Sequence, residues 1–136
     1  MVAERAIQRH AEVTELTCPY DNQYQGPRKR LLFVCSAGML RSPTAAAVAT
    51  SLGHNARSCG SALDYALIPI SVNLVYWADK IYFVKMDNYL EALEVFQFDK
   101  ATQHLVETKR VIWDLEDEHD YMHPDLVKIV TRLLSN

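Results

Sequence analysis

The stretch FVCSAGMLRSPTAAA, residues 33–47, decides how the first part of this chain folds. It begins inside RLLFVC (30–35), a continuous apolar run typical of a strand buried on both faces of a parallel sheet. It leads into the alanine-rich TAAAVATSL (44–52), which has the composition of a helix and is followed by Gly53, a residue that commonly ends helices. The sequence therefore predicts a buried strand, a short loop of small residues and a helix.

Outward from this stretch, apolar segments alternate between strand and helix patterns. Pro69 would lie in the first turn of one helix, where its missing N–H has no cost. Strands that alternate with helices of this length predict an α/β fold, with a parallel sheet covered by helices on both faces. The predicted strands are NARSCGS (55–61), KIYFVKM (80–86) and KRVIWDL (109–115), and the predicted helices are IPISVNLVYWA (68–78), DNYLEALEVFQ (87–97) and HPDLVKIVTRLLS (123–135).

Length and charge limit the organisation of the chain. It has 136 residues, of which 49% are hydrophobic, enough for one domain with a packed core. We expect residues 1–29 to be an N-terminal extension, with a short amphipathic helix over 2–16, and residues 30–136 to form the domain. A net charge of −3 excludes the global positive field that attracts nucleic acid or anionic lipid. Any anionic ligand must therefore be bound by a local site.

The three cysteines, Cys18, Cys35 and Cys59, form neither a CxxC pair nor a zinc-ligand pattern with histidine. This usage indicates a reducing compartment, without a disulfide scaffold or structural zinc. The charged N-terminal segment has no apolar signal region, and no apolar run approaches the length that spans a membrane. We therefore expect a cytoplasmic protein that binds no metal and no membrane.

The loop between the first strand and its helix lies where α/β proteins bind ligands, at the carboxyl ends of the strands. Ser42 can cap the helix, with Pro43 at the first helical position. Free backbone amides and the positive end of the helix dipole then make the loop a binding site for a tetrahedral anion. The predicted phosphate-binding residues are Ser36, Ala37, Gly38, Met39, Leu40 and Ser42.

Two side chains give this loop its predicted chemistry. Cys35 lies at the base of the loop, where the positive helix end favours the nucleophilic thiolate. Arg41 closes the loop with a planar guanidinium that can bind two oxygens of a phosphoryl group and stabilise transition-state charge. A cysteine after a strand is more often a small buried hydrophobic residue, and Cys-x5-Arg occurs readily by chance. The coincidence of this spacing with a strand, a loop and a helix start favours catalysis by Cys35 and Arg41.

The motifs VCSAGMLRSPTAAAVA (34–49), RSCGS (57–61) and WADKIYFVKMDN (77–88), followed by an acidic loop, resemble the low-molecular-weight protein tyrosine phosphatase superfamily, particularly its compact phage and bacterial members. The resemblance covers about residues 30–135 and implies a single domain with a four-stranded parallel sheet. It implies a two-step mechanism, in which Cys35 attacks phosphorus and water then hydrolyses a cysteinyl-phosphate. It also implies that no cofactor is needed and that Ser42 donates a hydrogen bond to the Cys35 thiolate.

Two loop positions depart from the family pattern. Gly38 stands where the family usually has asparagine, whose side chain holds an unusual backbone conformation through hydrogen bonds. Glycine reaches left-handed conformations without strain, so the loop can still form. Leu40 stands where many members have a second cysteine, so reversible disulfide protection of the nucleophile is lost at that place.

The leaving group needs a proton from a carboxylic acid on another loop. The acidic segment WDLEDEHDYMHPDL (113–126) follows the last predicted strand. Aligning its ending with the compact members of the family assigns the acid to Asp117. Asp114 is the second candidate, because the larger family places its acid directly after the strand. A solvated acidic surface is the better interpretation of the other three, Glu116, Glu118 and Asp120.

Three other residues have weaker signals. Ser58 matches a family serine that braces the phosphate loop, although packing within a strand explains it as well. Asp87 follows the third predicted strand and could contact the loop, but capping or first-turn charge on a helix is an equal explanation. Cys59 replaces the usual alanine of the family, and we expect it to be buried and inert.

The function predicted first is hydrolysis of a phosphomonoester, either phosphotyrosine in a protein or a small phosphorylated molecule, with phosphate-like anions as inhibitors. The acidic loop offers only Tyr121 as an aromatic wall for phosphotyrosine, so a nucleotide or an RNA-end phosphate stays open, although the charge disfavours nucleic acid. A catalytically weak phosphate-binding module is an alternative, because Gly38 and the acidic loop depart from the family pattern. An arsenate reductase is a weaker one, since it needs further cysteines and Cys18 and Cys59 lie in the wrong segments.

Overall fold

The computed structural model describes residues 28–116 and 118–135. The amphipathic helix expected over 2–16, with most of the expected N-terminal extension, lies outside these residues. None of the helices in the described ranges is long and apolar enough to cross a membrane. In chain order the elements are β1 (Arg30–Cys35), α2 (Arg41–Ser51), β2 (Asn55–Gly60), α3 (Val72–Trp77), β3 (Lys80–Phe83), α4 (Met86–Val95), α5 (Lys100–Lys109), β4 (Arg110–Ile112) and α6 (Pro124–Ser135).

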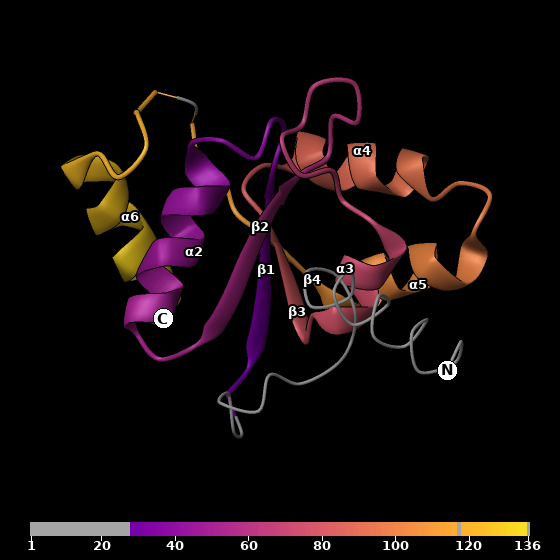
Figure 1. Ribbon diagram of the computed structural model, residues 1–136, viewed down its shortest axis with the longest axis horizontal. Coiled ribbons are helices and arrows are strands. Elements are labelled where there is room, and N and C mark those ends of the chain that lie inside the picture. The colour runs from indigo at the N-terminus through magenta and orange to yellow at the C-terminus, as the bar shows by residue number, and fades with distance from the viewer. Residues whose placement is uncertain (1–27, 117, 136) are drawn as a thin grey trace, which may run out of the picture.

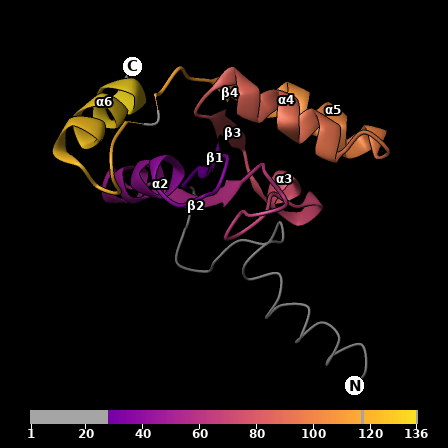
Figure 2. The ribbon, with the colours of Figure 1, turned by 90° about the horizontal axis from the view of Figure 1, so that it is seen from above.

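The four strands form one parallel sheet in the order β2-β1-β3-β4, which confirms the predicted α/β fold. Phe33 in β1 pairs with Ser58 in β2 and with Tyr82 in β3, which sets the register of the sheet. Figures 1 and 2 show α2 and α6 on one face of the sheet and α3, α4 and α5 on the other. Because the strands are parallel, the loops that follow them all lie at one edge, at the top of Figure 1.

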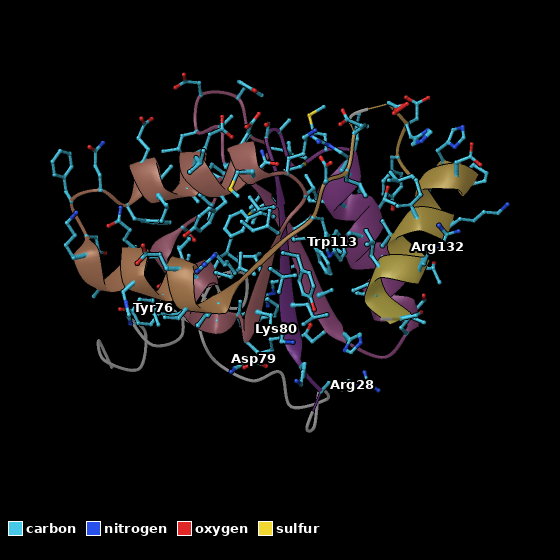
Figure 3. All side chains as sticks on the ribbon, turned by 180° about the vertical axis from the view of Figure 1, so that it is seen from behind. Arg28, Tyr76, Asp79, Lys80, Trp113 and Arg132 are labelled. Atoms are coloured by element: carbon cyan, nitrogen blue, oxygen red, sulfur yellow. The ribbon has the colours of Figure 1, made fainter. Side chains whose placement is uncertain are left out.

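Each face of the sheet has its own apolar core. Trp77 and Phe83 are fully buried in the core that α3, α4 and α5 cover. On the other face Phe33, Tyr82 and Trp113 form an aromatic group, with ring centroids 4.9 Å apart for Phe33 and Tyr82 and 5.1 Å apart for Tyr82 and Trp113. Figure 3 shows Trp113 on the side of the sheet that α6 covers. Since both faces are covered, β1 is buried along almost all of its length, as its continuous apolar run predicts.

Helix α5 is an element that the sequence pattern does not predict. Its sequence, KATQHLVETK, is largely polar, and only one of its apolar side chains, Val106, is fully buried. Asp99 caps it, because its Oδ1 accepts the N–H of Thr102 over 3.1 Å. The helix is therefore defined by its cap and by packing against the sheet, and its apolar periodicity is too weak to reveal it.

Helix α3 begins at Val72, four residues later than predicted. The expectation that Pro69 lies in its first turn is wrong, because the backbone at Pro69 forms an isolated parallel bridge with Gly60 at the end of β2. Ser71 caps the helix instead, and its Oγ accepts the N–H of Leu74 over 3.3 Å. The segment before α3 is thus extended and lies against the carboxyl edge of the sheet.

Candidate active site

The loop Ser36–Leu40 joins the end of β1 to the start of α2. Three backbone hydrogen bonds connect this part of the chain with residues 61–67, which follow β2. In each of them the acceptor is a carbonyl at the beginning of the loop, so these carbonyls face away from the loop's own centre. The bonds run from the N–H of Ser61 to Cys35 (2.8 Å), from that of Ala62 to Ser36 (3.0 Å) and from that of Leu67 to Ala37 (3.0 Å).

The N–H groups of the same loop are left for a ligand. Gly38 donates to Sγ of Cys35 over 3.1 Å. Among the hydrogen bonds of the described residues, the other amides of residues 36–40 have no protein acceptor. A cavity of about 150 Å³ lies at this place, and the residues that line it are Cys35, Ser36, Ala37, Met39, Leu40, Arg41 and Tyr65. We call this arrangement the anion cradle, and it is the geometry that binds tetrahedral anions at helix N-termini.

Cys35 lies at the base of the anion cradle and is only 3% exposed. Its Sγ is 3.1 Å from Oγ of Ser42. The Ser42 hydroxyl also lies 3.3 Å from the carbonyl oxygen of Cys59, so its single proton can be donated to either acceptor. With the amide of Gly38, two donors can therefore stabilise negative charge on the sulfur.

The predicted helix cap is wrong. Helix α2 begins at Arg41, one residue before Ser42, and Leu40 is at the N-cap position without a side-chain hydrogen bond. Ser42 is fully buried within the first turn, where its hydroxyl contacts the Cys35 thiol. The hydroxyl is thus directed at the candidate nucleophile and leaves the helix end uncapped.

Gly38 has a φ of +72°, the left-handed conformation expected for it. A Cβ at this position would lie 3.0 Å from the carbonyl carbon of Cys59 and 3.1 Å from the amide nitrogen of Gly60. These are backbone atoms of β2, so they cannot move aside as the end of a flexible side chain could. Glycine is needed here for the backbone conformation and also for the close approach of the loop to β2.

We expect Gly38→Ala to lower the free energy of unfolding by about 2–4 kcal/mol, because left-handed strain and overpacking add together. Gly53→Ala is the matched control, since Gly53 has a φ of +97° but no atom within 4 Å of an added Cβ. The control should cost only the backbone strain of about 1–2 kcal/mol. Urea denaturation of both variants measures the difference, and equal losses would show that the contact with β2 has no effect.

Arg41 connects the anion cradle with the segment after β4. Arg41 as a whole is 7% exposed, and its Nη1 donates to the carbonyl oxygen of Leu115 over 2.9 Å. Arg41 also lines the cavity above Cys35. One side chain can therefore hold the neighbouring segment and present further N–H donors to an anion.

Thr44 makes a second connection to the same segment. Its Oγ1 accepts the N–H of Met122 over 2.8 Å and donates to the carbonyl oxygen of Leu40 over 2.8 Å. Met122 has a φ of +60°, which is uncommon for a residue with a side chain. The acidic segment is thus attached to the cradle and its helix at both ends, through Leu115 and Met122.

The candidate general acids that the structure describes are all exposed, and two of them bind a lysine. Asp117 lies outside the described residues. The side chain of Asp114 is 86% exposed, and its Oδ1 is 3.1 Å from Nζ of Lys85. Glu116 binds the same ammonium over 2.7 Å. The hydrogen bonds and charges of Glu116 and Asp114 raise the pKa of Lys85, so this lysine stays protonated and holds Asp114 at the surface, outside the lining of the cavity. Glu118 and Asp120 are exposed.

Ser58 and Asp87, two residues that could brace the loop, lie apart from it. Ser58 is in the middle of β2, opposite Phe33. Asp87 is exposed in the first turn of α4. Neither side chain makes a hydrogen bond to the cradle among the contacts of the described residues.

A buried polar network that the sequence does not predict lies behind the loop. Nδ2 of Asn88 donates to Oγ of Ser36 over 3.0 Å and to Oγ of Ser61 over 3.3 Å. The Ser61 hydroxyl donates to Oε1 of Glu91 over 2.6 Å. Asn88 directly follows Asp87, so the residue that contacts the loop is one position after the one that the sequence indicates. These side chains fix the loop from the α4 side.

Cys59 is buried on the opposite face of the sheet from Cys35. It belongs to the core that α3, α4 and α5 cover, whereas Cys35 packs with α2 and α6. Burial raises the pKa of the Cys59 thiol well above its usual value, and the neighbouring Cys35 raises it further. Cys59 therefore stays protonated and unreactive. Among the described residues, no three histidine, cysteine or acidic side chains are grouped so that they could hold a metal ion.

A four-stranded parallel sheet with an anion cradle after its first strand in sequence is the fold of the low-molecular-weight protein tyrosine phosphatases, which confirms the resemblance of the sequence at the level of the fold. One similar solved structure is Wzb of Vibrio vulnificus in complex with benzylphosphonate, with a TM-score of 0.60, 14% identity, and coverage of 79% of this chain and 95% of that one. Another is the YwlE arginine phosphatase of Geobacillus stearothermophilus, with a TM-score of 0.57, 17% identity, and coverage of 79% and 91%.

A third is the low-molecular-weight protein tyrosine phosphatase SP-PTP of Streptococcus pyogenes, with a TM-score of 0.52, 16% identity, and coverage of 76% and 87%. No protein-family model matches the sequence, and no curated protein matches it at a significant level. At these identities the likeness shows a common fold, and the chemistry must be argued from the site of this chain.

Proposed function

We propose that this chain is a cysteine-dependent phosphatase that hydrolyses a phosphomonoester. The observation that supports this most is the position of Cys35 Sγ at the base of a cavity lined by loop residues and Arg41, with hydrogen-bond contacts to Ser42 and Gly38. A nucleophile, amide donors and a guanidinium converge on one cavity of about 150 Å³, which has room for a phosphoryl group. Among the described residues, no histidine lines this cavity to serve as the base that acyl transfer by a cysteine requires.

In the first step the Cys35 thiolate attacks phosphorus, the bond between phosphorus and the ester oxygen breaks, and a cysteinyl-phosphate forms. Amides of the loop and the Arg41 guanidinium stabilise the charge on the equatorial oxygens. In the second step water attacks phosphorus and the thiolate leaves. Ser42 assists this step, because a hydrogen bond from its hydroxyl stabilises the departing thiolate.

We assign the general acid to Asp117. Arg41 binds Leu115 and Thr44 binds Met122, so these two residues, which flank Asp117 in the sequence, lie beside the residues of the cradle. Asp114 and Glu116 are bound by Lys85 at the surface, and this arrangement disfavours both as proton donors to a ligand in the cavity. Asp117 has the position in the sequence that the alignment with compact phosphatases favours.

Asp117→Asn should slow hydrolysis of an alkyl phosphate by about 10²-fold and affect an activated aryl phosphate much less, because only a poor leaving group needs the proton. The measurement is kcat/KM for phosphomonoesters with rising leaving-group pKa. Asp114→Asn is the matched control and should follow the wild-type dependence. If kcat/KM depends more steeply on the leaving-group pKa in Asp114→Asn alone, the general acid is Asp114.

A catalytically weak phosphate-binding module is the second candidate. The hydrogen bond of Arg41 to the Leu115 carbonyl favours it, because that donor is engaged by the protein. Turnover of p-nitrophenyl phosphate, a phosphopeptide panel and a nucleotide panel by the wild-type protein separates the two functions. An arsenate reductase is disfavoured by the position of Cys59 in the opposite core.

A further inference from the structure

A second and larger cavity, of about 540 Å³, adjoins the anion cradle. It lies between residues 61–65, which follow β2, and the end of α4 with the turn after it, where Figure 1 shows the loop rising above α4. Tyr65 lines both cavities, so the two adjoin at this side chain. We call the larger one the acidic groove. A ligand whose phosphate is in the cradle can extend into it.

The charges of the acidic groove are all of one sign. Asp64, Glu91 and Glu94 line it, and among the described residues no lysine, arginine or histidine does. Glu91 accepts the hydrogen bond of Ser61, whose N–H in turn donates to the Cys35 carbonyl, so the groove is built onto the base of the cradle. Asp64 and Glu94 are exposed. A ligand that occupies both cavities therefore contacts N–H donors in the anion cradle and carboxylates in the acidic groove.

Two exposed aromatic side chains, Tyr65 and Phe98, line the acidic groove. Phe98 is 94% exposed and Tyr65 is 64% exposed, an unusual degree of exposure for such side chains. Aromatic rings next to carboxylates form a favourable site for lysine or arginine, whose stems pack on the rings and whose charges contact the carboxylates. An additional phosphate at this place would be repelled.

The geometry points to a phosphorylated polypeptide with lysine or arginine next to the phosphorylated residue as the substrate class, with these cationic side chains bound in the acidic groove. This inference rests on the proposed phosphatase function and goes further, since it selects a basic protein segment over a small phosphate ester and over a nucleotide or RNA end. Extended peptide advances about 3.3 Å per residue, so the basic side chains belong within about three residues of the phosphorylated one.

The test uses phosphotyrosine peptides of one core sequence, with lysine, glutamine or glutamate at the flanking positions. Wild-type protein should favour the lysine peptide over the glutamate peptide in kcat/KM by about 10-fold at low salt, and less at high salt. In the double variant D64N/E94Q the preference should fall to about 3-fold or less, since exposed ion pairs contribute modestly. Turnover of p-nitrophenyl phosphate, which has no flanking residues, should stay within about 2-fold of wild type. Glu107→Gln, on α5 and outside the groove lining, is the matched control and should keep the full preference.

Equal kcat/KM for the three peptides, with p-nitrophenyl phosphate hydrolysed normally, would contradict recognition of basic residues by the acidic groove. It would leave the proposed phosphatase function unaffected. Faster hydrolysis of a 5′-phosphorylated oligonucleotide than of the lysine peptide would also overturn it. If no substrate is hydrolysed, the proposed phosphatase function is wrong. The acidic groove is then tested by binding, with the same peptides carrying a phosphonate in place of the phosphate. A preference for the lysine phosphonate peptide that D64N/E94Q removes would then support the groove on a binding module, and no preference would exclude it.

Discussion

Cys35→Ser should lower kcat by roughly 10⁴-fold or more, while phosphate and vanadate should still bind. The serine hydroxyl is much less acidic than a thiol, and the alkoxide would be a poor leaving group in the second step. The amides of the loop and Arg41 are unchanged by the substitution, so the anion keeps its donors. Steady-state kinetics with p-nitrophenyl phosphate and calorimetric titration with vanadate measure the two effects.

Cys59→Ala is the matched control for this experiment. Cys59 is buried in the opposite core, and its raised pKa keeps the thiol protonated. Its removal should lower stability modestly and leave kcat near the wild-type value. Activity retained by Cys35→Ser would exclude the covalent mechanism and leave the cavity as a phosphate-binding site.

Arg41→Lys should lower kcat by about 10³-fold, because an ammonium is a point charge and cannot contact two phosphoryl oxygens in the transition state. The substitution also removes the planar donor that holds the Leu115 carbonyl beside the cradle. Arg132→Lys, on α6 and labelled in Figure 3 away from the cradle, is the matched control and should have normal kinetics.

Two measurements separate the roles of Arg41. If its guanidinium binds the phosphoryl group, the affinity for vanadate should fall together with kcat for every substrate. If it only holds the Leu115 segment, the affinity should persist and the loss should grow with the pKa of the leaving group, as it does when the acid is missing. Near-normal rates for Arg41→Lys on all substrates would contradict both roles.

Much of the fold could be predicted because its signals are local. β1 has the bounds that its apolar run predicts, and the loop after it reaches a helix through a short stretch of small residues. Gly38 adopts the left-handed conformation expected of a glycine at that place. Helix α5 shows where such reasoning fails, since polar helices have little periodicity and are stabilised by packing on a sheet that the local sequence does not describe.

The bracing of the site could not be predicted, because it depends on contacts between distant segments. Asn88 and Ser36 are 52 residues apart, and Met122 and Thr44 are 78 apart. Serine, threonine and asparagine occur in the sequence mostly as turn and cap residues, and no spacing rule distinguishes a buried bracing residue from these. The sequence favours Ser58 and Asp87 as bracing residues. The residues that contact the cradle are Ser61, three positions after Ser58, and Asn88, one position after Asp87.

The sequence by itself determined which four segments form strands, the place of the anion cradle and the residues available in it, because backbone propensities and the path from strand to helix act over a few neighbouring residues. Tertiary structure alone decided that Lys85 holds Asp114 at the surface, that Asn88 donates to the Ser36 hydroxyl, and that an acidic groove adjoins the cradle. These features arise from the packing of segments far apart in the chain, where side-chain direction and neighbouring charge depend on the complete fold.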